Sequence, residues 1–254
     1  MARAAVPGRL TRRLSWRVAQ LAEFRDETPT ARTLVFNVPA WPGHLAGQHV
    51  DVRLTAEDGY TAQRSYSIAA PADGDRVELT VQRVADGEVS PYLTEVLSVG
   101  DAVEIRGPVG GWFVWDRDDP RPVLLVAGGS GIAPLMAMIR ARRAAAIRTP
   151  FRLIYSVRAP DERFYAGELR ELARHADGLD VAYVFTRTVP RGWARSPGRI
   201  SAADITAHGW PPDFDPSCFV CGPTGFVETV ADTLIAVGHD SARIKTERFG
   251  PTGG

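Results

Sequence analysis

Cysteine is scarce in this chain, which has only Cys218 and Cys221 among its 254 residues. Two thiols are too few for the four thiolates of an iron–sulfur cluster. The segment 217–221 predicts a strand, and residues three apart on a strand point to opposite faces. We therefore expect neither a disulfide nor a shared metal at this pair.

An excess of one charge and long apolar runs are also missing. The chain has 30 basic and 30 acidic residues, which argues against a general nucleic-acid or membrane-surface binder. No apolar run approaches the roughly 20 residues that cross a bilayer. The first 17 residues carry five arginines, no acidic residue and no apolar core of the secretory kind. We interpret 1–15 as a basic arm and expect a cytoplasmic protein.

Histidines in metal-ligand spacing are absent as well. The five are scattered along the chain, so we expect no metal site and assign each of them to surface or core packing: His44, His49, His175, His208 and His239.

The first half of the chain has the pattern of a small antiparallel β-barrel. Short alternating segments are separated by glycine-containing turns from about Trp16 to Trp115. The expected strands are 32–38, 49–54, 65–69, 76–84 and 102–105, and a short helix is expected at 90–97. We place this domain at 16–117.

The second half, 118–254, alternates strands with helices, which predicts a parallel sheet covered on both faces. The expected strands are 123–127, 152–157, 181–186, 218–221 and 243–248, and the expected helices are 135–143, 165–175, 202–206 and 224–237.

The most informative segment joins the strand at 123–127 to a glycine-rich turn and a helix. Glycines let the backbone approach a ligand closely, and the first N–H groups of a helix are unpaired and suit a phosphate. The turn therefore predicts a nucleotide-phosphate cradle made of Gly129, Ser130, Gly131 and Pro134. The alternative is a tight strand-to-helix turn without a ligand.

Three motifs in this order resemble the ferredoxin–NADP reductase family of flavoproteins. They are Arg64-Ser65-Tyr66-Ser67, the Gly129–Pro134 turn, and Cys221-Gly222-Pro223-Thr224-Gly225-Phe226. The resemblance covers nearly the whole chain from about Trp16. It implies an FAD-binding Greek-key β-barrel followed by a doubly wound NAD(P)-binding sheet, as in oxygenase reductase components and the reductase part of flavohaemoglobins. Since neither an iron–sulfur domain nor a globin accompanies them, we expect a bare two-domain reductase.

The resemblance also implies which residues hold the flavin. Arg64 would pair with its phosphate, Tyr66 would lie along the ring and ribityl chain, and Ser67 would hydrogen-bond near N5. Further contacts would come from Ser65, Gln82, Gly87, Val89 and Ser90. Two phosphate contacts favour FAD over FMN. The alternative for Arg64–Ser67 is an ordinary amphipathic strand.

In the second domain, the cradle would hold the pyrophosphate of a nicotinamide dinucleotide. Cys221 would stand near the nicotinamide and position it, without covalent chemistry, and Gly222 and Pro223 would shape the turn. Phe249 would cover the flavin ring, and Glu247 would lie at the flavin edge and assist proton transfer. The alternatives are that Cys221 only packs in the core, that Phe249 is a core residue and that Glu247 lies on the surface.

Basic side chains favour NADP over NAD. After the expected strand 152–157 no acid occurs before Asp161, although an acid at this place often serves the NAD ribose. Arg158, Arg187 and Arg199 could pair with a 2′-phosphate. The alternative is that the coenzyme is NAD and that these arginines belong to a solvent-exposed basic loop.

The expected activity is therefore an FAD-dependent NAD(P)H oxidoreductase that passes electrons to a separate protein, such as a ferredoxin. Two alternatives stay open: a free-flavin or small-molecule reductase, and a non-enzymatic redox-sensing module. We expect no nucleic-acid or membrane partner, and the sequence does not indicate an oligomeric state.

Overall fold

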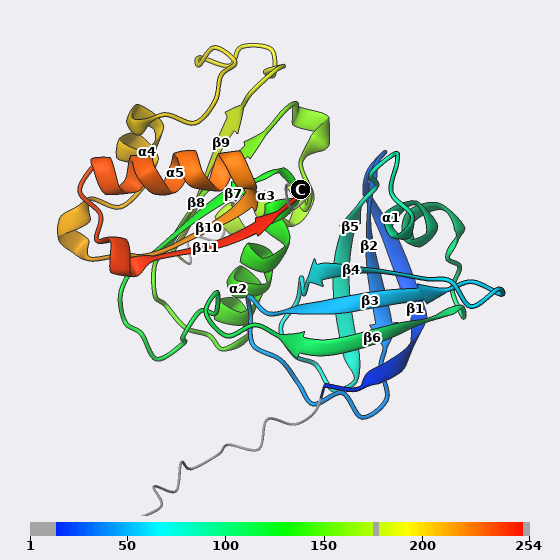
Figure 1. Cartoon of the computed structure of the whole chain (residues 1–254). Coiled ribbons are helices and arrows are strands. Elements are labelled where there is room, and N and C mark those ends of the chain that lie inside the picture. The colour runs from blue at the N-terminus through cyan, green and yellow to red at the C-terminus, as the bar shows by residue number, and fades with distance from the viewer. Residues whose placement is uncertain (1–13, 175–177, 251–254) are drawn as a thin grey trace, which may run out of the picture.

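The computed structural model describes residues 14–174 and 178–250 (Figure 1). His175, the tail 251–254 and all but the last two residues of the expected basic arm lie outside this range. Within it, a β-barrel is followed by a layered α/β domain, as predicted.

Six antiparallel strands build the first domain in the order β4-β3-β6-β1-β2-β5. Their bounds are β1 (Trp16–Thr28), β2 (Ala31–Asn37), β3 (His49–Thr55), β4 (Thr61–Ser67), β5 (Arg76–Gln82) and β6 (Ala102–Val109). A single bridge between Ile68 and Leu79 links the two outer strands, which gives the sheet its barrel form. A short helix α1 (Val89–Pro91) continues into a π-helical turn, Tyr92–Val96, and lies beside β4.

Strand β1 is the element that the sequence did not single out. Ala19 and Leu21 are buried and alternate with exposed neighbours, but residues 22–26 are all exposed. A bulge between Leu21 and Glu23 interrupts the register with β2. A strand with one half exposed on both faces lacks the period-2 pattern that identifies a strand.

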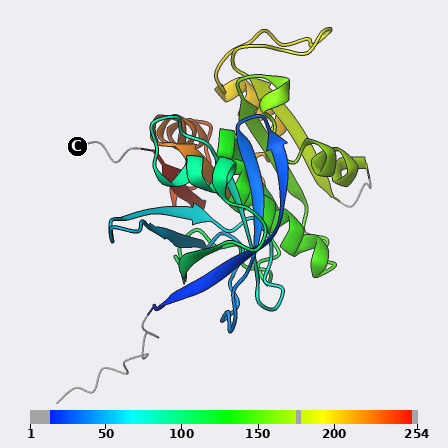
Figure 2. The same ribbon diagram turned by 90° about the vertical axis from the view of Figure 1, so that its right-hand side faces the viewer.

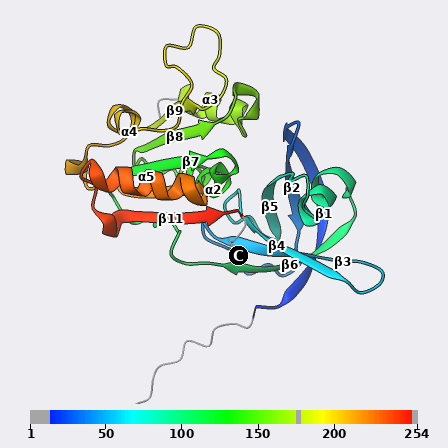
Figure 3. The same cartoon turned by 45° about the horizontal axis from the view of Figure 1, so that its top comes forward.

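Five parallel strands build the second domain in the order β11-β10-β7-β8-β9. The strands are β7 (Val123–Gly128), β8 (Phe151–Val157), β9 (Leu179–Phe185), β10 (Ser217–Pro223) and β11 (Ile244–Phe249). The helices are α2 (Ile132–Ala144), α3 (Ala166–Arg174), α4 (Ala202–His208) and α5 (Thr224–Ala236). Helices α2 and α3 pack on one face, and α4 and α5 on the other (Figure 3), which confirms the doubly wound arrangement.

Helix α2 links the two domains. Its apolar residues share one core with the sheet and with Ala31, Ala46, Ala69 and Phe113 of the first domain. Figure 1 shows α2 beside the barrel and β11 ending where the two domains meet, and Figure 2 shows the barrel in front of the second domain. This packing brings the carboxyl ends of the parallel strands next to the barrel. None of the helices in 14–174 and 178–250 is long and apolar enough to span a membrane.

Candidate functional site

The glycine-rich turn after β7 packs directly on the turn after β10. A Cβ added to Gly131 would lie 2.2 Å from the carbonyl oxygen of Cys221, and one added to Gly128 would lie 2.7 Å from the ring of Phe226. Only glycine allows this close approach. No side chain caps the start of the 3-10 turn Gly129–Gly131, which leads into α2, so the N–H groups that open this turn can serve a phosphate of the kind predicted.

A cavity of about 200 Å³ opens at these carboxyl ends and reaches the barrel. Six residues predicted from the sequence line it: Gln82, Gly129, Ser130, Arg158, Pro223 and Phe249. Gln82 comes from β5 of the barrel, and the others come from the second domain. Ligands of open α/β sheets bind at this place, outside the strand ends where the chain order reverses. The cavity therefore connects the predicted nucleotide cradle with the barrel, where Gln82 is the one predicted flavin-binding residue in its lining.

Beside the cavity, Glu247 of β11 meets Ser67 of β4. The Ser67 hydroxyl donates to Glu247 Oε2 at 3.1 Å, and the Cys221 thiol lies 3.8 Å from the same oxygen. Burial, followed by the charge of Glu247, raises the pKa of the Cys221 thiol well above its usual value. The sulfur is therefore protonated at neutral pH and is a poor nucleophile. Three of the four residues predicted to be catalytic thus form one cluster across the two domains.

The two cysteines point to opposite faces of β10, as their spacing predicts. Cys221 belongs to the core under α2, whereas Cys218 belongs to the core under α4 and α5. Both thiols are free and fully buried. Among the described residues, no group of three or more His, Cys, Asp or Glu side chains could hold a metal ion.

On the barrel, the Arg64–Ser67 motif divides between two faces of β4. Tyr66 packs against the barrel core, and burial raises the pKa of its phenol. Arg64 is exposed and its guanidinium donates only to the carbonyl of Gln63 within the described part of the chain. The Ser65 hydroxyl instead donates to Asp51 at 2.7 Å. An exposed guanidinium without a carboxylate partner fits a flavin phosphate, whereas a contact from Ser65 would have to come from its backbone.

The second predicted phosphate segment lies at the start of α1. The Ser90 hydroxyl accepts the N–H of Val84 at 3.0 Å, and Val89 is buried. A Cβ on Gly87 would lie 3.1 Å from the Ser90 hydroxyl oxygen, so this turn is closely packed. Because α1 lies beside β4, the segment is a neighbour of the strand that carries Arg64. The roles of Gly87, Val89 and Ser90 toward a flavin stay predictions.

Two arginines follow neighbouring strand ends. Arg158 comes after β8 and Arg187 after β9, and the Arg187 N–H donates to the Arg158 carbonyl at 2.9 Å. Both side chains are exposed, and neither has a carboxylate partner in the part of the chain that the structure describes. Arg199 is also exposed, and of the three arginines only Arg158 lines the cavity. Glu162, which the sequence analysis did not select, does line it.

His49 is a second residue that the sequence analysis missed. It was assigned to packing, but its Nδ1 lies 3.6 Å from Oε1 of Glu247. This contact could not be predicted from a local pattern, because Ser67 is 18 positions and Glu247 is 198 positions away from His49 in the sequence.

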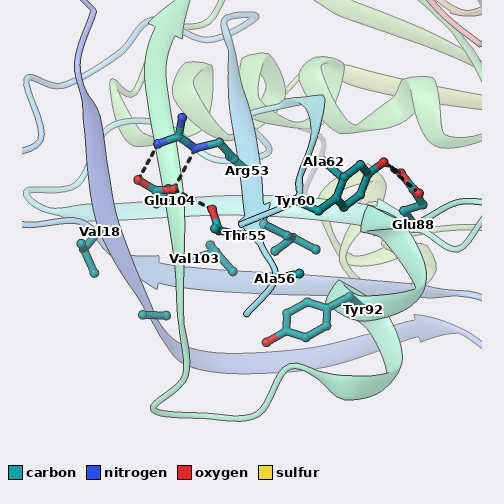
Figure 4. A pocket seen from close by; sticks show the side chains of 12 residues that line it. Val18, Arg53, Thr55, Ala56, Tyr60, Ala62, Glu88, Tyr92, Val103 and Glu104 are labelled. Carbon is teal, nitrogen blue, oxygen red and sulfur yellow. Dashed lines mark hydrogen bonds and ion pairs between the residues drawn. The ribbon is translucent and has the colours of Figure 1, made fainter. Parts of the chain in front are cut away.

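A larger groove of about 560 Å³ lies on the barrel alone (Figure 4). It runs between the β3–β4 hairpin, α1 and the start of β6. Its charged groups are already paired: Arg53 with Glu104, and Glu88 with the hydroxyl of Tyr60. It has none of the predicted site residues in its lining and no glycine-rich turn. The interdomain cavity is therefore the better candidate site despite its smaller volume.

Comparison with known proteins identifies two domains in the same order. The model of the oxidoreductase FAD-binding domain matches residues 19–114, and that of the oxidoreductase NAD-binding domain matches residues 125–232.

Curated relatives include reductase components of oxygenases. The chain is 33% identical over 239 residues to the ferredoxin reductase component of 3-ketosteroid-9-alpha-monooxygenase from Mycolicibacterium smegmatis, which covers 91% of this chain and 64% of the relative. It is 30% identical over 212 residues to a flavohemoprotein of Pseudomonas putida, covering 84% of this chain and 52% of the relative. The chain thus spans less than two thirds of the length of these relatives.

Solved structures share the fold over nearly the whole chain. The FAD/NAD-binding domain of nitric oxide dioxygenase from Vibrio cholerae has a TM-score of 0.82 at 27% identity and covers 92% of this chain and 99% of that one. An Amycolatopsis cytochrome P450 reductase has a TM-score of 0.83 at 27% identity, covering 97% and 73%. A ferredoxin NADP⁺ reductase from Neisseria gonorrhoeae, solved with FAD and NADP, has a TM-score of 0.77 at 20% identity, covering 92% and 98%.

Proposed function

The chain belongs to the ferredoxin–NADP reductase-like family of oxidoreductases, in which an FAD-binding domain precedes an NAD-binding domain, and from this premise we propose that it passes a hydride from NAD(P)H to bound FAD. We propose that the electrons then leave to a separate redox protein, such as a ferredoxin or an oxygenase component. The names of the relatives support this assignment, since they include reductase components of monooxygenases.

One observation carries the proposal. The cavity at the carboxyl ends of the parallel strands is completed by Gln82 of the barrel and by Phe249 at the end of β11. A dinucleotide held on the Gly129–Gly131 turn would therefore face the barrel, where Arg64 and Tyr66 would hold the flavin. FAD, when bound, supplies the ability to accept two electrons and to release them singly.

The chain's own residues position and shield the reacting groups. Phe249 has 38% of its surface exposed at the edge of the cavity, so its ring can cover a flavin and yield to a nicotinamide. Ser67 holds its hydroxyl toward the Glu247 carboxylate, which can accept a proton at Oε2. Cys221 stays a thiol and occupies the space next to this carboxylate. Such positioning is the main contribution of a protein to hydride transfer between cofactors.

For the nicotinamide substrate we propose NADPH. The exposed guanidinium groups of Arg158 and Arg187 lie at adjacent strand ends and suit a 2′-phosphate. Glu162 in the same cavity is the feature that would instead suit the ribose hydroxyls of NADH.

The purified protein tests this proposal. We expect a yellow protein that keeps its flavin through gel filtration, is bleached anaerobically by NADPH faster than by NADH, and then reduces a ferredoxin. A colourless protein that does not take up FAD would contradict the proposal. Loss of flavin during gel filtration would favour a free-flavin reductase, and bound flavin that NAD(P)H does not reduce would favour a sensor.

A further inference from the structure

Glu247 is held from three strands and from both domains. Its Oε2 is approached by the Ser67 hydroxyl of β4 and the Cys221 thiol of β10. Its Oε1 faces Nδ1 of His49, on β3, at 3.6 Å. The two oxygens of this carboxylate therefore have different partners, and among the described residues only Oε1 has a partner that can carry a positive charge.

The barrel places His49 for this contact. His49 and Ser67 lie directly opposite each other in the β3–β4 register, so both side chains project from the same face of the sheet toward β11. Gly110, whose φ of +94° favours glycine, forms the turn beside the imidazole, where an added Cβ would lie in ordinary contact with Nδ1 at 3.4 Å. The position is thus set by two strands and a turn of the barrel.

The surroundings of the pair leave the imidazole open to solvent. The side chain of His49 is 28% exposed and that of Glu247 is 20% exposed. Asp51, two residues further along β3, is already paired with Arg106 and accepts a hydrogen bond from Ser65. His49 can therefore face Glu247 on one side and water on the other.

We propose that His49 is a positioning residue for Glu247, an inference that rests on the proposed function. Without a partner for Oε1, the carboxylate can rotate away from Ser67. With His49 in place, Oε2 stays directed at the Ser67 hydroxyl and at the cavity beside it.

Two matched amide variants test the contact. The amide of His49→Asn occupies the place of Nδ1, whereas that of His49→Gln extends toward the place of Nε2. We expect H49Q to slow anaerobic reduction of the bound flavin by NADPH about tenfold, because a displaced group at a reaction centre is costly. H49N should stay within about twofold of wild type. H208Q, which changes an exposed histidine on α4, is the control and should have no effect.

A double-mutant cycle with Glu247→Gln gives a second test, and its Tm readout does not depend on turnover. If His49 acts through Glu247, the Tm shifts of H49Q and E247Q in the flavin-free chain should not add, and H49Q should not slow flavin reduction further in the E247Q background. Equal rates for H49N and H49Q, or additive effects in the cycle, would overturn the inference. A wild-type protein that binds no flavin, or is not reduced, would instead refute the proposed function, and the Tm cycle would still test the contact.

Discussion

Arg140, on helix α2 of the second domain, forms an ion pair with Glu78 on strand β5 of the barrel. Both side chains are 14% exposed, and the same guanidinium also pairs with Glu168 of α3 and donates to the carbonyl of Ala69 in the barrel at 2.9 Å. Nearby, the N–H of Tyr165 donates to Glu27 of β1 at 2.9 Å. These contacts hold the strand ends of the second domain at a set place beside the barrel.

Replacing Arg140 by Met should therefore destabilise the protein. Within the described part of the chain, Glu168 would lose its ion-pair partner and Glu78 would keep only Arg25, so we expect a loss of about 2–3 kcal/mol in the free energy of unfolding. Urea denaturation measures this loss. The matched control is Arg76→Met, which breaks an exposed pair with Glu23 and should cost less than about 1 kcal/mol. Equal losses in the two variants would show that the interdomain pair has no special role.

Gly131→Ala tests the phosphate cradle. The new Cβ would lie 2.2 Å from the Cys221 carbonyl oxygen, so the turns after β7 and β10 must move apart. We therefore expect a loss of about 3 kcal/mol in the free energy of unfolding, together with loss of NADPH binding. Thermal unfolding and fluorescence titration with NADPH measure the two effects.

Gly225→Ala is the control for this variant. A Cβ at Gly225, in the first turn of α5, meets nothing within 4 Å, and alanine favours a helix by up to about 1 kcal/mol. This variant should be as stable as wild type or more so. A stable G131A that binds NADPH normally would contradict the packing of the two turns.

Arg187→Ala tests the choice of coenzyme. Loss of a charge-assisted hydrogen bond worth about 1.5–3 kcal/mol should lower the kcat/KM ratio of NADPH to NADH roughly tenfold or more. Steady-state kinetics with both coenzymes measure this ratio. Arg143→Ala, at the opposite end of α2 from the cradle, should leave it unchanged. If R187A also leaves it unchanged, the assignment of Arg187 to a 2′-phosphate is wrong.

The lowered pKa of Asp204 predicts that the stability of the protein depends on pH. Burial would raise its pKa, but hydrogen bonds from Ser201 and Arg195, together with the charge of Arg195, lower it overall. A carboxyl group with a lowered pKa in the folded state stabilises the protein above the unfolded-state pKa of about 4, and this contribution disappears as the pH falls through the folded-state pKa.

The variant Asp204→Asn should therefore be less stable than wild type at pH 7, by about 1–2 kcal/mol, because it also breaks the capping box of α4. Urea denaturation between pH 7 and pH 2 should show this difference shrinking below pH 4. Asp232→Asn, on the exposed face of α5, should change stability by less than about 0.5 kcal/mol throughout. A difference that grows as the pH falls would contradict the sign of the pKa shift.

Much of the fold could be predicted because its signals are local. The alternating segments of the barrel, the buried run 123–127 and the helices around it follow from side-chain period alone, and the glycines at 128–131 mark the turn between them. The opposite orientations of Cys218 and Cys221 also follow from strand geometry. Strand β1 escaped this reasoning because its outer half is exposed on both faces.

The candidate site depends on contacts between distant segments, which no local pattern records. The motif at 64–67 suggested Ser67 and the tail suggested Glu247, but their hydrogen bond, the place of His49 and the inclusion of Glu162 arise only when α2 seats the sheet against the barrel. Local residue types were thus enough for the two domains and for most candidate groups, because periodicity and turn chemistry act over a few residues. Which groups meet, and which oxygen of Glu247 faces which partner, was decided by the packing of one domain on the other.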